Sequence, residues 1–205
     1  MITFQPYEHT MHEQGLLHIA GVDEAGRGPL AGPVVAAAVI FPPDVLIDGV
    51  NDSKKLTASE RERLFDSIRL KALSVGIGIS SHSTIDEINI LEASMVAMQQ
   101  AVIQLSVRPD HLLIDGNIYR DGSVPYTTIV GGDAKCHSIA AASIIAKVTR
   151  DRLMVQYHEQ YPQYGFAKHK GYGTREHIEA IRKYGPCEIH RKSFHVSSLE
   201  TTNGG

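Results

Sequence analysis

The chain has 205 residues, of which 42% are hydrophobic and 21% are charged, which is enough for one domain with a sizeable core. Its two cysteines lack the spacing of a metal-binding or disulfide framework, so reduced thiols are expected. The N-terminus has no basic segment followed by an apolar core, and the longest uncharged run, residues 28–43, is too short to span a membrane. These features argue against disulfide-rich secreted proteins and membrane-spanning proteins, and they predict a cytoplasmic monomer without membrane contact.

Charge is unevenly distributed along the chain. The net charge is −3, but residues 133–192 contain eleven Lys and Arg residues against six Asp and Glu, a local charge of +5. The other residues carry nine basic and seventeen acidic side chains, a local charge of −8. This division predicts a surface for a polyanion close to a site that binds cations, although chance segregation of solvated charges gives the same pattern.

The first half of the chain contains three apolar runs of strand length. Runs at 17–22 and 34–41 are joined by a link rich in Gly and Pro, which predicts neighbouring strands. A helix is expected over 57–73, because Glu60 lies three residues after a threonine cap and completes a capping box. Alternating small and apolar residues at 74–80 predict a third strand.

The second half is predicted to contain three helices and two short strands. The helix expected to end near Gln160 has a first half that is nearly all small or apolar, so this helix should be buried. In order, we expect a helix capped by Ser83 or Thr84, strands at 111–115 and 126–130, a helix from Ala134 or Lys135 to about Gln160, and a helix at 174–183. This order predicts an α/β fold with a central mixed β-sheet flanked by helices and a helical C-terminal region.

Four acidic residues lie where apolar strands end: Asp23, Glu24, Asp115 and Asp133. Carboxylates converging beside apolar strands would repel one another unless a cation compensates them, and oxygen ligands favour Mg²⁺ or Mn²⁺ over zinc. Each aspartate could instead cap a turn or a helix, and for Asp133 alone that reading is favoured. Capping explains Asp23 and Glu24 poorly, because a strand precedes them. The residues alone therefore indicate an acidic metal site.

Seven segments of the chain, in order, resemble the motifs of the ribonuclease HII family. The first, GVDEAGRGPLAGPV at 21–34, corresponds to the signature of that family. The others are DSKKL at 52–56, IDGN at 114–117, GDAK at 132–135, AAASIIAKVTRD at 140–151, KGYGT at 170–174 and HRKSF at 190–194. Because one motif could arise by chance but seven in order could hardly do so, the resemblance is specific, and it covers about residues 17–195.

The resemblance implies a ribonuclease H-like fold and an endoribonuclease that cleaves the RNA strand of RNA–DNA hybrids. It also implies cleavage on the 5′ side of single ribonucleotides embedded in duplex DNA, leaving a 5′-phosphate, and so the removal of ribonucleotides from DNA. Asp23, Glu24, Asp115 and Asp133 correspond to its metal-binding acids. Two divalent ions, Mg²⁺ or Mn²⁺, would activate water and stabilise the leaving oxygen. We expect Asp23 and Asp115 to contact both ions.

The resemblance assigns substrate recognition to Gly26-Arg27-Gly28 and to Tyr172. The first segment would sense the 2′-hydroxyl of the ribonucleotide, because glycines let backbone groups approach closely and Arg27 can hold a phosphate. Tyr172 would pack on the following deoxyribose at an RNA–DNA junction. From the residues alone, the glycines could form an ordinary turn or, less well, a dinucleotide loop, and Tyr172 could pack on the core.

Several basic side chains are expected to bind phosphates of the substrate. Each one alone is better explained as a solvated charge, but together with the motif match binding is favoured. These residues are Lys54, Lys55, Lys135, Lys170 and Arg191. Three histidines in the basic C-terminal region receive no role: His169, His177 and His190.

Two other functions are weighed against the nuclease. An actin-like sugar or acetate kinase would need two duplicated halves, and the chain has no repeat. A non-catalytic module that binds RNA–DNA hybrids gains nothing from four clustered acids, since they would repel a polyanion. We expect residues 1–16 to be a loose tail, 17–199 to form one catalytic domain and 200–205 to be frayed. Contact with a replication clamp is left open.

Overall fold

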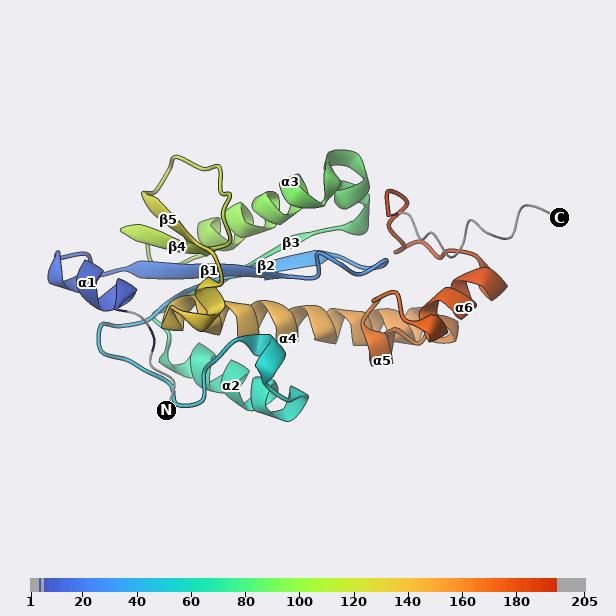
Figure 1. The fold of residues 1–205 in the computed structure, drawn as a ribbon, viewed down its shortest axis with the longest axis horizontal. Helices are drawn as coiled ribbons and strands as arrows, with labels where there is room; N and C mark the ends of the chain where they lie inside the picture. Colours follow the sequence, from blue (N-terminus) through green and yellow to red (C-terminus); the bar gives the residue numbers. More distant parts are fainter. Residues whose placement is uncertain (1–3, 5, 195–205) are drawn as a thin grey trace.

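The computed structural model describes residue 4 and residues 6–194, which form a five-stranded mixed sheet with helices around it (Figure 1). The strands are β1 (Ile19–Ala25), β2 (Val34–Ile40), β3 (Ser74–Ser80), β4 (His111–Asp115) and β5 (Tyr126–Ile129). Their order in the sheet is β3-β2-β1-β4-β5. The pairs β1–β2 and β2–β3 are antiparallel, whereas β1–β4 and β4–β5 are parallel. The predicted α/β fold with a mixed sheet is confirmed.

Helices cover both faces of this sheet (Figure 1). On one face lies α3 (His82–Ile103), and on the other lies α4 (His137–Gln160), with α2 (Ala58–Lys71) packed outside α4. All seven residues of β2 are buried, and they alternate between the core under α3 and the core under α4. The uninterrupted apolar run at 34–41 follows from this position, because a strand covered on both faces needs no polar side.

Glycines in the strands let both helices approach the sheet closely. A Cβ added to Gly76 or Gly78 of β3 would lie 1.9 Å from a backbone carbonyl oxygen of α3. A Cβ added to Gly21 of β1 would lie 2.1 Å from the backbone of Ser138 in α4. These distances are far below van der Waals contact, so the helix–sheet spacing depends on glycine at these positions.

The helix caps explain where the predicted boundaries hold and where they shift. Thr57 and Glu60 form the predicted capping box of α2. The cap of α3 is Ser81, two residues before the first predicted position, and its hydroxyl accepts from the N–H of Thr84. The helix α4 begins at His137 because a 3₁₀ turn, η2 (Gly132–Ala134), precedes it.

A short helix, α1 (Tyr7–Glu13), lies where a loose tail was expected. The carboxylate of Glu8 accepts hydrogen bonds from the N–H and the hydroxyl of Ser138, at 3.0 and 2.8 Å, and so satisfies donors at the start of α4. Tyr7 and Met11 pack on a small core beside β1 and β4. These contacts, distant in sequence, give the segment a structure that its polar composition does not predict.

The C-terminal region is helical, as predicted, and folds back against the end of α4 (Figure 1). It contains a 3₁₀ turn, η3 (Pro162–Tyr164), a single helical turn, α5 (Phe166–His169), and α6 (Arg175–Tyr184), which is capped by Thr174. The expected frayed tail at 200–205 lies outside the described residues. Among the described helices, none is long and apolar enough to cross a membrane.

We predict that Gly78→Ala lowers the free energy of unfolding by about 3 kcal/mol, because the new methyl would overlap the carbonyl oxygen of Ala97. The matched control is Gly122→Ala, since a Cβ at Gly122 meets no atom within 4 Å. Urea unfolding of both variants measures the difference. Equal stability of the two variants would show that α3 can move away from β3 at little cost.

Candidate active site

Asp23, within β1, and Asp115, the last residue of β4, lie side by side because these strands pair in parallel. Val22 is in register with Ile114, so the following residues, Asp23 and Asp115, are neighbours on strands that lie about 4.8 Å apart. Their side chains point toward the α4 face, since the residues two positions earlier on each strand pack against α4. The parallel pairing therefore places two carboxylates together at one edge of the sheet.

Asp133 reaches the same edge from the turn that follows β5. The N–H of Gly132 in η2 donates to Oδ1 of Asp115 at 2.6 Å, which ties this turn to the end of β4. The side chain of Asp133 is 9% exposed, and its Oδ2 lies 3.4 Å from Nζ of Lys54. Asp23, Glu24, Asp115 and Asp133 are called the acid cluster below.

Burial and mutual repulsion raise the pKa values of three members of the acid cluster. Burial is the main cause for Asp23, whose pKa is well above its usual range, and the charges of Glu24 and Asp115 add to it. Burial also raises the pKa of Glu24, although the nearby Arg27 opposes the shift. The pKa of Asp115 is raised by burial and then by the charge of Asp133. A cation at this position would remove the unfavourable energy that these shifts express.

The acid cluster offers oxygen atoms suited to a hard divalent cation. Oε2 of Glu24 is buried and has no hydrogen-bond partner among residue 4 and residues 6–194, whereas its Oε1 lies 3.3 Å from Nη1 of Arg27. A buried carboxylate oxygen without a partner is costly unless an ion satisfies it. The donors are carboxylates only, a set that fits Mg²⁺ or Mn²⁺.

No three Asp, Glu, His or Cys side chains of the described residues converge closely enough to enclose an ion by themselves. This arrangement is compatible with Mg²⁺, which retains several waters and is held by one or two carboxylates together with the phosphates of a substrate. The residues present therefore fit an ion that protein and substrate hold jointly. They do not form a closed structural metal site.

Lys54 is held beside the acid cluster by a capped turn. Oδ1 of Asp52 accepts from the N–H of Lys54 at 2.9 Å and begins the 3₁₀ turn η1 (Ser53–Lys55). The hydroxyl of Ser53 lies 2.8 Å from that of Ser143 in α4, which in turn hydrogen-bonds Asp23. Burial opposes protonation of Lys54, but Asp133, Asp52 and Asp23 outweigh it and raise its pKa. Lys54 therefore stays positively charged next to the acids.

The structure brings the Gly26-Arg27-Gly28 segment close to Tyr172. A Cβ added to Gly28 would lie 3.8 Å from Cε1 of the Tyr172 ring. That ring is 44% exposed, and Nζ of Lys147 lies 5.9 Å from its centre. Two segments that the sequence separates by more than 140 residues thus form one surface next to Glu24.

The expectation that Arg191 contacts phosphate does not fit its position. Arg191 is 3% exposed, and its guanidinium donates to the carbonyl oxygens of Gly26, Arg27, Gly32 and Pro33, at 2.6 to 3.3 Å. These bonds engage the guanidinium with the backbone beneath the glycine segment. Arg191 therefore shapes the segment from below, because the turn directs its carbonyl oxygens inward and they need buried donors.

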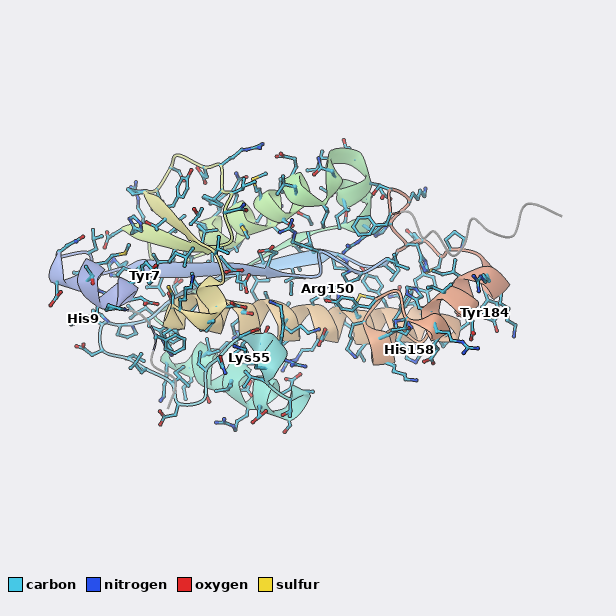
Figure 2. All side chains as sticks on the ribbon, in the orientation of Figure 1. Tyr7, His9, Lys55, Arg150, His158 and Tyr184 are labelled. Atoms are coloured by element: carbon cyan, nitrogen blue, oxygen red, sulfur yellow. The ribbon has the colours of Figure 1, made fainter. Side chains whose placement is uncertain are left out.

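Arg150 of α4, labelled in Figure 2, holds the residues that follow the glycine segment. It is fully buried and donates to the carbonyl oxygens of Pro33, Ala31 and Lys170, at 2.9, 3.1 and 3.0 Å. The N–H of Leu30 donates to the carbonyl of Gly171 at 2.8 Å. The glycine segment and the turn that carries Tyr172 are thereby joined directly.

The four lysines expected at phosphates occupy different settings. Lys54 and Lys55 are exposed, and both lie 4.0 Å from carboxylate oxygens of Asp52. The ammonium of Lys135 donates to the carbonyl of Val130 at 2.7 Å, and that of Lys170 donates to the carbonyl of Ala167. Lys54 is thus the lysine that the structure places against the acid cluster.

Three further residues of this region were missed by the sequence reasoning: Ser143, Lys147 and Arg150. They contact Asp23, the ring of Tyr172 and the glycine segment, respectively. Their spacing of four and three residues places them on one face of α4. Polar residues at this spacing, in a stretch that is otherwise small and apolar, are the signal that could have found them.

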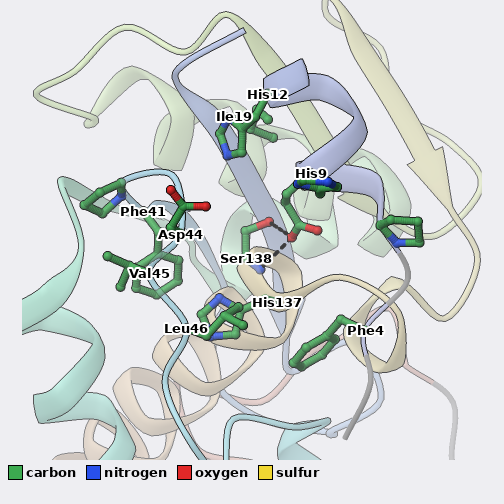
Figure 3. A pocket seen from close by; sticks show the side chains of 13 residues that line it. Phe4, His9, His12, Ile19, Phe41, Asp44, Val45, Leu46, His137 and Ser138 are labelled. Carbon is green, nitrogen blue, oxygen red and sulfur yellow. Dashed lines mark hydrogen bonds between the residues drawn. The ribbon is translucent and has the colours of Figure 1, made fainter. Parts of the chain in front are cut away.

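A hollow of about 510 Å³ lies away from the acid cluster, between α1, the segment after β2 and the start of α4 (Figure 3). Phe41, Val45, Leu46 and His137 are among its lining residues, and no member of the acid cluster is. This hollow is therefore not the candidate active site. An extended nucleic acid needs an open, shallow groove rather than a deep hollow of this kind.

The mixed sheet, with acids at the adjacent ends of its parallel strands, defines a ribonuclease H-like fold. Comparisons with known proteins support this assignment. A ribonuclease HII from Acetivibrio thermocellus is 62% identical over 188 residues, which are 92% of this chain and 73% of that protein. Two solved structures share the fold: the PCNA:RNase HII complex from Archaeoglobus fulgidus (26% identity, TM-score 0.73, 88% and 96% of the two chains) and Bst-RNase HIII with Mn²⁺ (21% identity, TM-score 0.69, 88% and 67%).

The sequence profile of ribonuclease HII matches residues 20–197, and the chain belongs to this family. It is therefore a ribonuclease H enzyme, an endonuclease that acts on RNA–DNA hybrids. The predicted resemblance is confirmed.

We predict that Asp23→Asn raises the melting temperature of the metal-free protein at neutral pH. Because the folded-state pKa of Asp23 is raised, the folded protein binds more protons than the unfolded one above the unfolded pKa, and stability falls as the pH rises through that window. The amide removes this penalty and keeps the acceptor for the N–H of Glu24. Each kcal/mol that the substitution adds to the free energy of unfolding should raise the melting temperature by about 2–4 °C.

Thermal unfolding in EDTA at pH 4 and pH 7.5 tests this expectation, with Asp66→Asn on the exposed side of α2 as the control for the charge change. The advantage of Asp23→Asn should shrink at pH 4. Addition of Mn²⁺ should stabilise the original protein more than the variant. A lower melting temperature for Asp23→Asn at pH 7.5 would contradict the inferred repulsion.

Proposed function

We propose that this enzyme hydrolyses the RNA strand of hybrids and also cuts on the 5′ side of single ribonucleotides in duplex DNA, using two divalent ions. The observation that carries this proposal is the position of Asp23 and Asp115 directly after the last residues paired between β1 and β4, beside an oxygen of Glu24 that has no hydrogen-bond partner among the described residues. Its role would be the removal of ribonucleotides from DNA.

Asp23, Glu24, Asp115 and Asp133 would hold the ions, with Asp23 and Asp115 between them. Bound Mg²⁺ or Mn²⁺ would supply charge to activate a water and to stabilise the departing 3′-oxygen. Lys54, charged and 79% exposed, is placed to draw a phosphate of the substrate toward the acids. Lys55, Lys135 and Lys170 are proposed as further phosphate contacts along the strand.

Gly26, Arg27 and Gly28 would recognise the ribonucleotide by its 2′-hydroxyl. Arg191 supports this proposal, because it binds the inward-facing carbonyls of Gly26 and Arg27 and so leaves the other face of the segment for the substrate. Arg150 holds the residues that follow the segment, through the carbonyls of Ala31 and Pro33. Arg27 is exposed and close to Glu24. A sugar bound at this segment would therefore lie next to the acid cluster, as selective hydrolysis requires.

A non-catalytic module that binds hybrids is the alternative proposal. This alternative makes a different prediction. A binding module should bind hybrids more tightly after losing its clustered acids, because they repel the phosphates. The buried position of Asp23 favours catalysis over this alternative, since an acid that costs stability is retained for a function.

Contacts with other proteins remain predictions. The Archaeoglobus fulgidus relative was solved in a complex with PCNA, which supports a proposal that this chain also contacts a sliding clamp. A pull-down with the clamp of the host cell, compared with a chain shortened after residue 194, would test it. The monomeric state and the cytoplasmic location are likewise proposed.

We predict that Asp23→Asn abolishes cleavage of a duplex DNA with one ribonucleotide while binding stays within about threefold. The substitution removes a metal ligand's charge but leaves Lys54 and the glycine segment in place. Cleavage in Mg²⁺ and fluorescence anisotropy in Ca²⁺ measure the two properties, and Asp66→Asn should leave both unchanged. Parallel loss of binding and cutting would argue against a separate catalytic role for Asp23.

We predict that Tyr172→Ala slows cleavage at an RNA–DNA junction on the order of 10²-fold, and cleavage within an all-RNA strand much less. A ring packed on the following deoxyribose would be displaced by a 2′-hydroxyl, so its removal should matter mainly at junctions. Both rates are measured with saturating enzyme at one Mg²⁺ concentration. Equal losses on both substrates would show that Tyr172 is a general packing residue.

A further inference from the structure

The backbone carbonyl of Tyr172 is the end of a chain of hydrogen bonds through two buried histidines. Its oxygen lies 2.9 Å from Nδ1 of His177. Nε2 of His177 lies 3.1 Å from Nε2 of His190, and the N–H of Cys187 donates to Nδ1 of His190 at 2.9 Å. We call His177 and His190 the histidine relay.

The chemistry of the two ends fixes the direction of every bond in the relay. A carbonyl oxygen can only accept, so Nδ1 of His177 donates to Tyr172, and Nε2 of His177 is left as an acceptor. Nε2 of His190 must then donate to it, and Nδ1 of His190 accepts from the N–H of Cys187. The carbonyl oxygen of Cys187 also lies 3.2 Å from Nδ1 of His190. A proton on that Nδ1 would point at the N–H of Cys187, however, and would leave the Nε2 atoms of His190 and His177, 3.1 Å apart, with a lone pair each and no proton between them.

Both rings of the relay are enclosed and uncharged. His177 is 0% exposed and His190 is 5% exposed, and Phe166 packs against both rings. Burial lowers the pKa of His177 to about 4, and it lowers the pKa of His190 as well. A neutral pair with one donor directed at Tyr172 is therefore the stable arrangement at neutral pH.

The relay completes the fixation of the turn that carries the Tyr172 ring. Arg150 binds the carbonyl of Lys170, and Leu30 binds that of Gly171. At Tyr172 itself the backbone N–H donates to the carbonyl of His169 at 3.0 Å. Three successive carbonyls are thus held by three different parts of the chain, and the relay supplies the side-chain donor for the residue whose ring is exposed.

We propose that His177, oriented by His190, is a positioning residue for Tyr172 and thereby for the choice of RNA–DNA junctions. This inference rests on the proposed role of Tyr172 in packing on the following deoxyribose. The histidines touch no substrate, and they act by fixing the backbone from which the ring projects. The glycines beside Tyr172 make this necessary, because residues 171 and 173 place few conformational limits on the turn.

Two amide substitutions separate the relay bond from the bulk of the ring. In His177→Asn the amide nitrogen takes the place of Nδ1 and still donates to Tyr172. In His177→Gln the amide lies near the place of Nε2, so the contact with His190 remains and the side-chain donor to the Tyr172 carbonyl is lost. The N–H of Thr174 still donates to that carbonyl at 2.8 Å in both variants, so the comparison isolates the bond from residue 177. The measured quantity is the ratio of the cleavage rate at a junction to the rate within an all-RNA strand, in Mg²⁺.

We expect His177→Gln to lower this ratio about tenfold and His177→Asn to leave it within about twofold, since one positioned hydrogen bond is at stake. In a Tyr172→Ala background, His177→Gln should have no further effect on the ratio. If Tyr172→Ala lowers the ratio but the two amides behave alike, the relay inference is overturned. If Tyr172→Ala leaves the ratio unchanged, the proposed role of Tyr172 itself fails.

A second pair of variants covers the case in which His177→Gln does not fold, as judged by circular dichroism. His190→Gln places an amide donor near Nε2 and should keep the ratio, whereas His190→Asn cannot reach His177 and should lower it. The opposite order, or equal ratios for the two folded variants, would also overturn the inference.

Discussion

The repulsion between the buried carboxylate of Asp23 on β1 and the half-buried carboxylate of Asp115 at the end of β4 is the constraint on which the rest of the site depends. Asp23 and Asp115 are adjacent because their strands pair in parallel, and burial raises the pKa of both. The fold offsets this cost locally, with the N–H of Gly132 on Asp115 and with Lys54 beside Asp133. A strained acid cluster of this kind is a common mark of a functional site, because stability alone would replace it.

The second organising feature is a pair of buried arginines that form no ion pair with a carboxylate of the described residues. Arg191 donates to backbone carbonyls of the glycine segment, and Arg150 donates to those of Ala31 and Pro33 just after it. Burial lowers the pKa of Arg150 to about 10 and that of Arg191 to about 9. A turn rich in Gly and Pro has little regular hydrogen bonding of its own. The guanidinium groups supply the missing hydrogen bonds, since the fixed planar donors of each group can satisfy several carbonyls at once.

The sequence predicted the strands, the capping box of α2 and the mixed sheet, because these depend on local periodicity and caps. It also indicated that the four acids share one edge, since strand ends meet there. It could not predict α1, whose structure depends on the contact of Glu8 with Ser138, or the burial of Arg191, whose partners lie about 160 residues away. Such contacts are decided by tertiary packing, which leaves no short-range pattern in the chain.

One consequence follows from the way that α4 carries Ser143, Lys147 and Arg150 on a single face. These residues touch, in turn, Asp23, the ring of Tyr172 and the carbonyl of Lys170. From the first to the last the helix rises about 10 Å, at 1.5 Å per residue. The helix therefore fixes the spacing between the residues that contact Asp23 and those that contact the Tyr172 turn, and with it the distance between the proposed sites of cleavage and of substrate recognition. Because all three residues belong to one continuous helix, movement of a surface loop does not change this spacing.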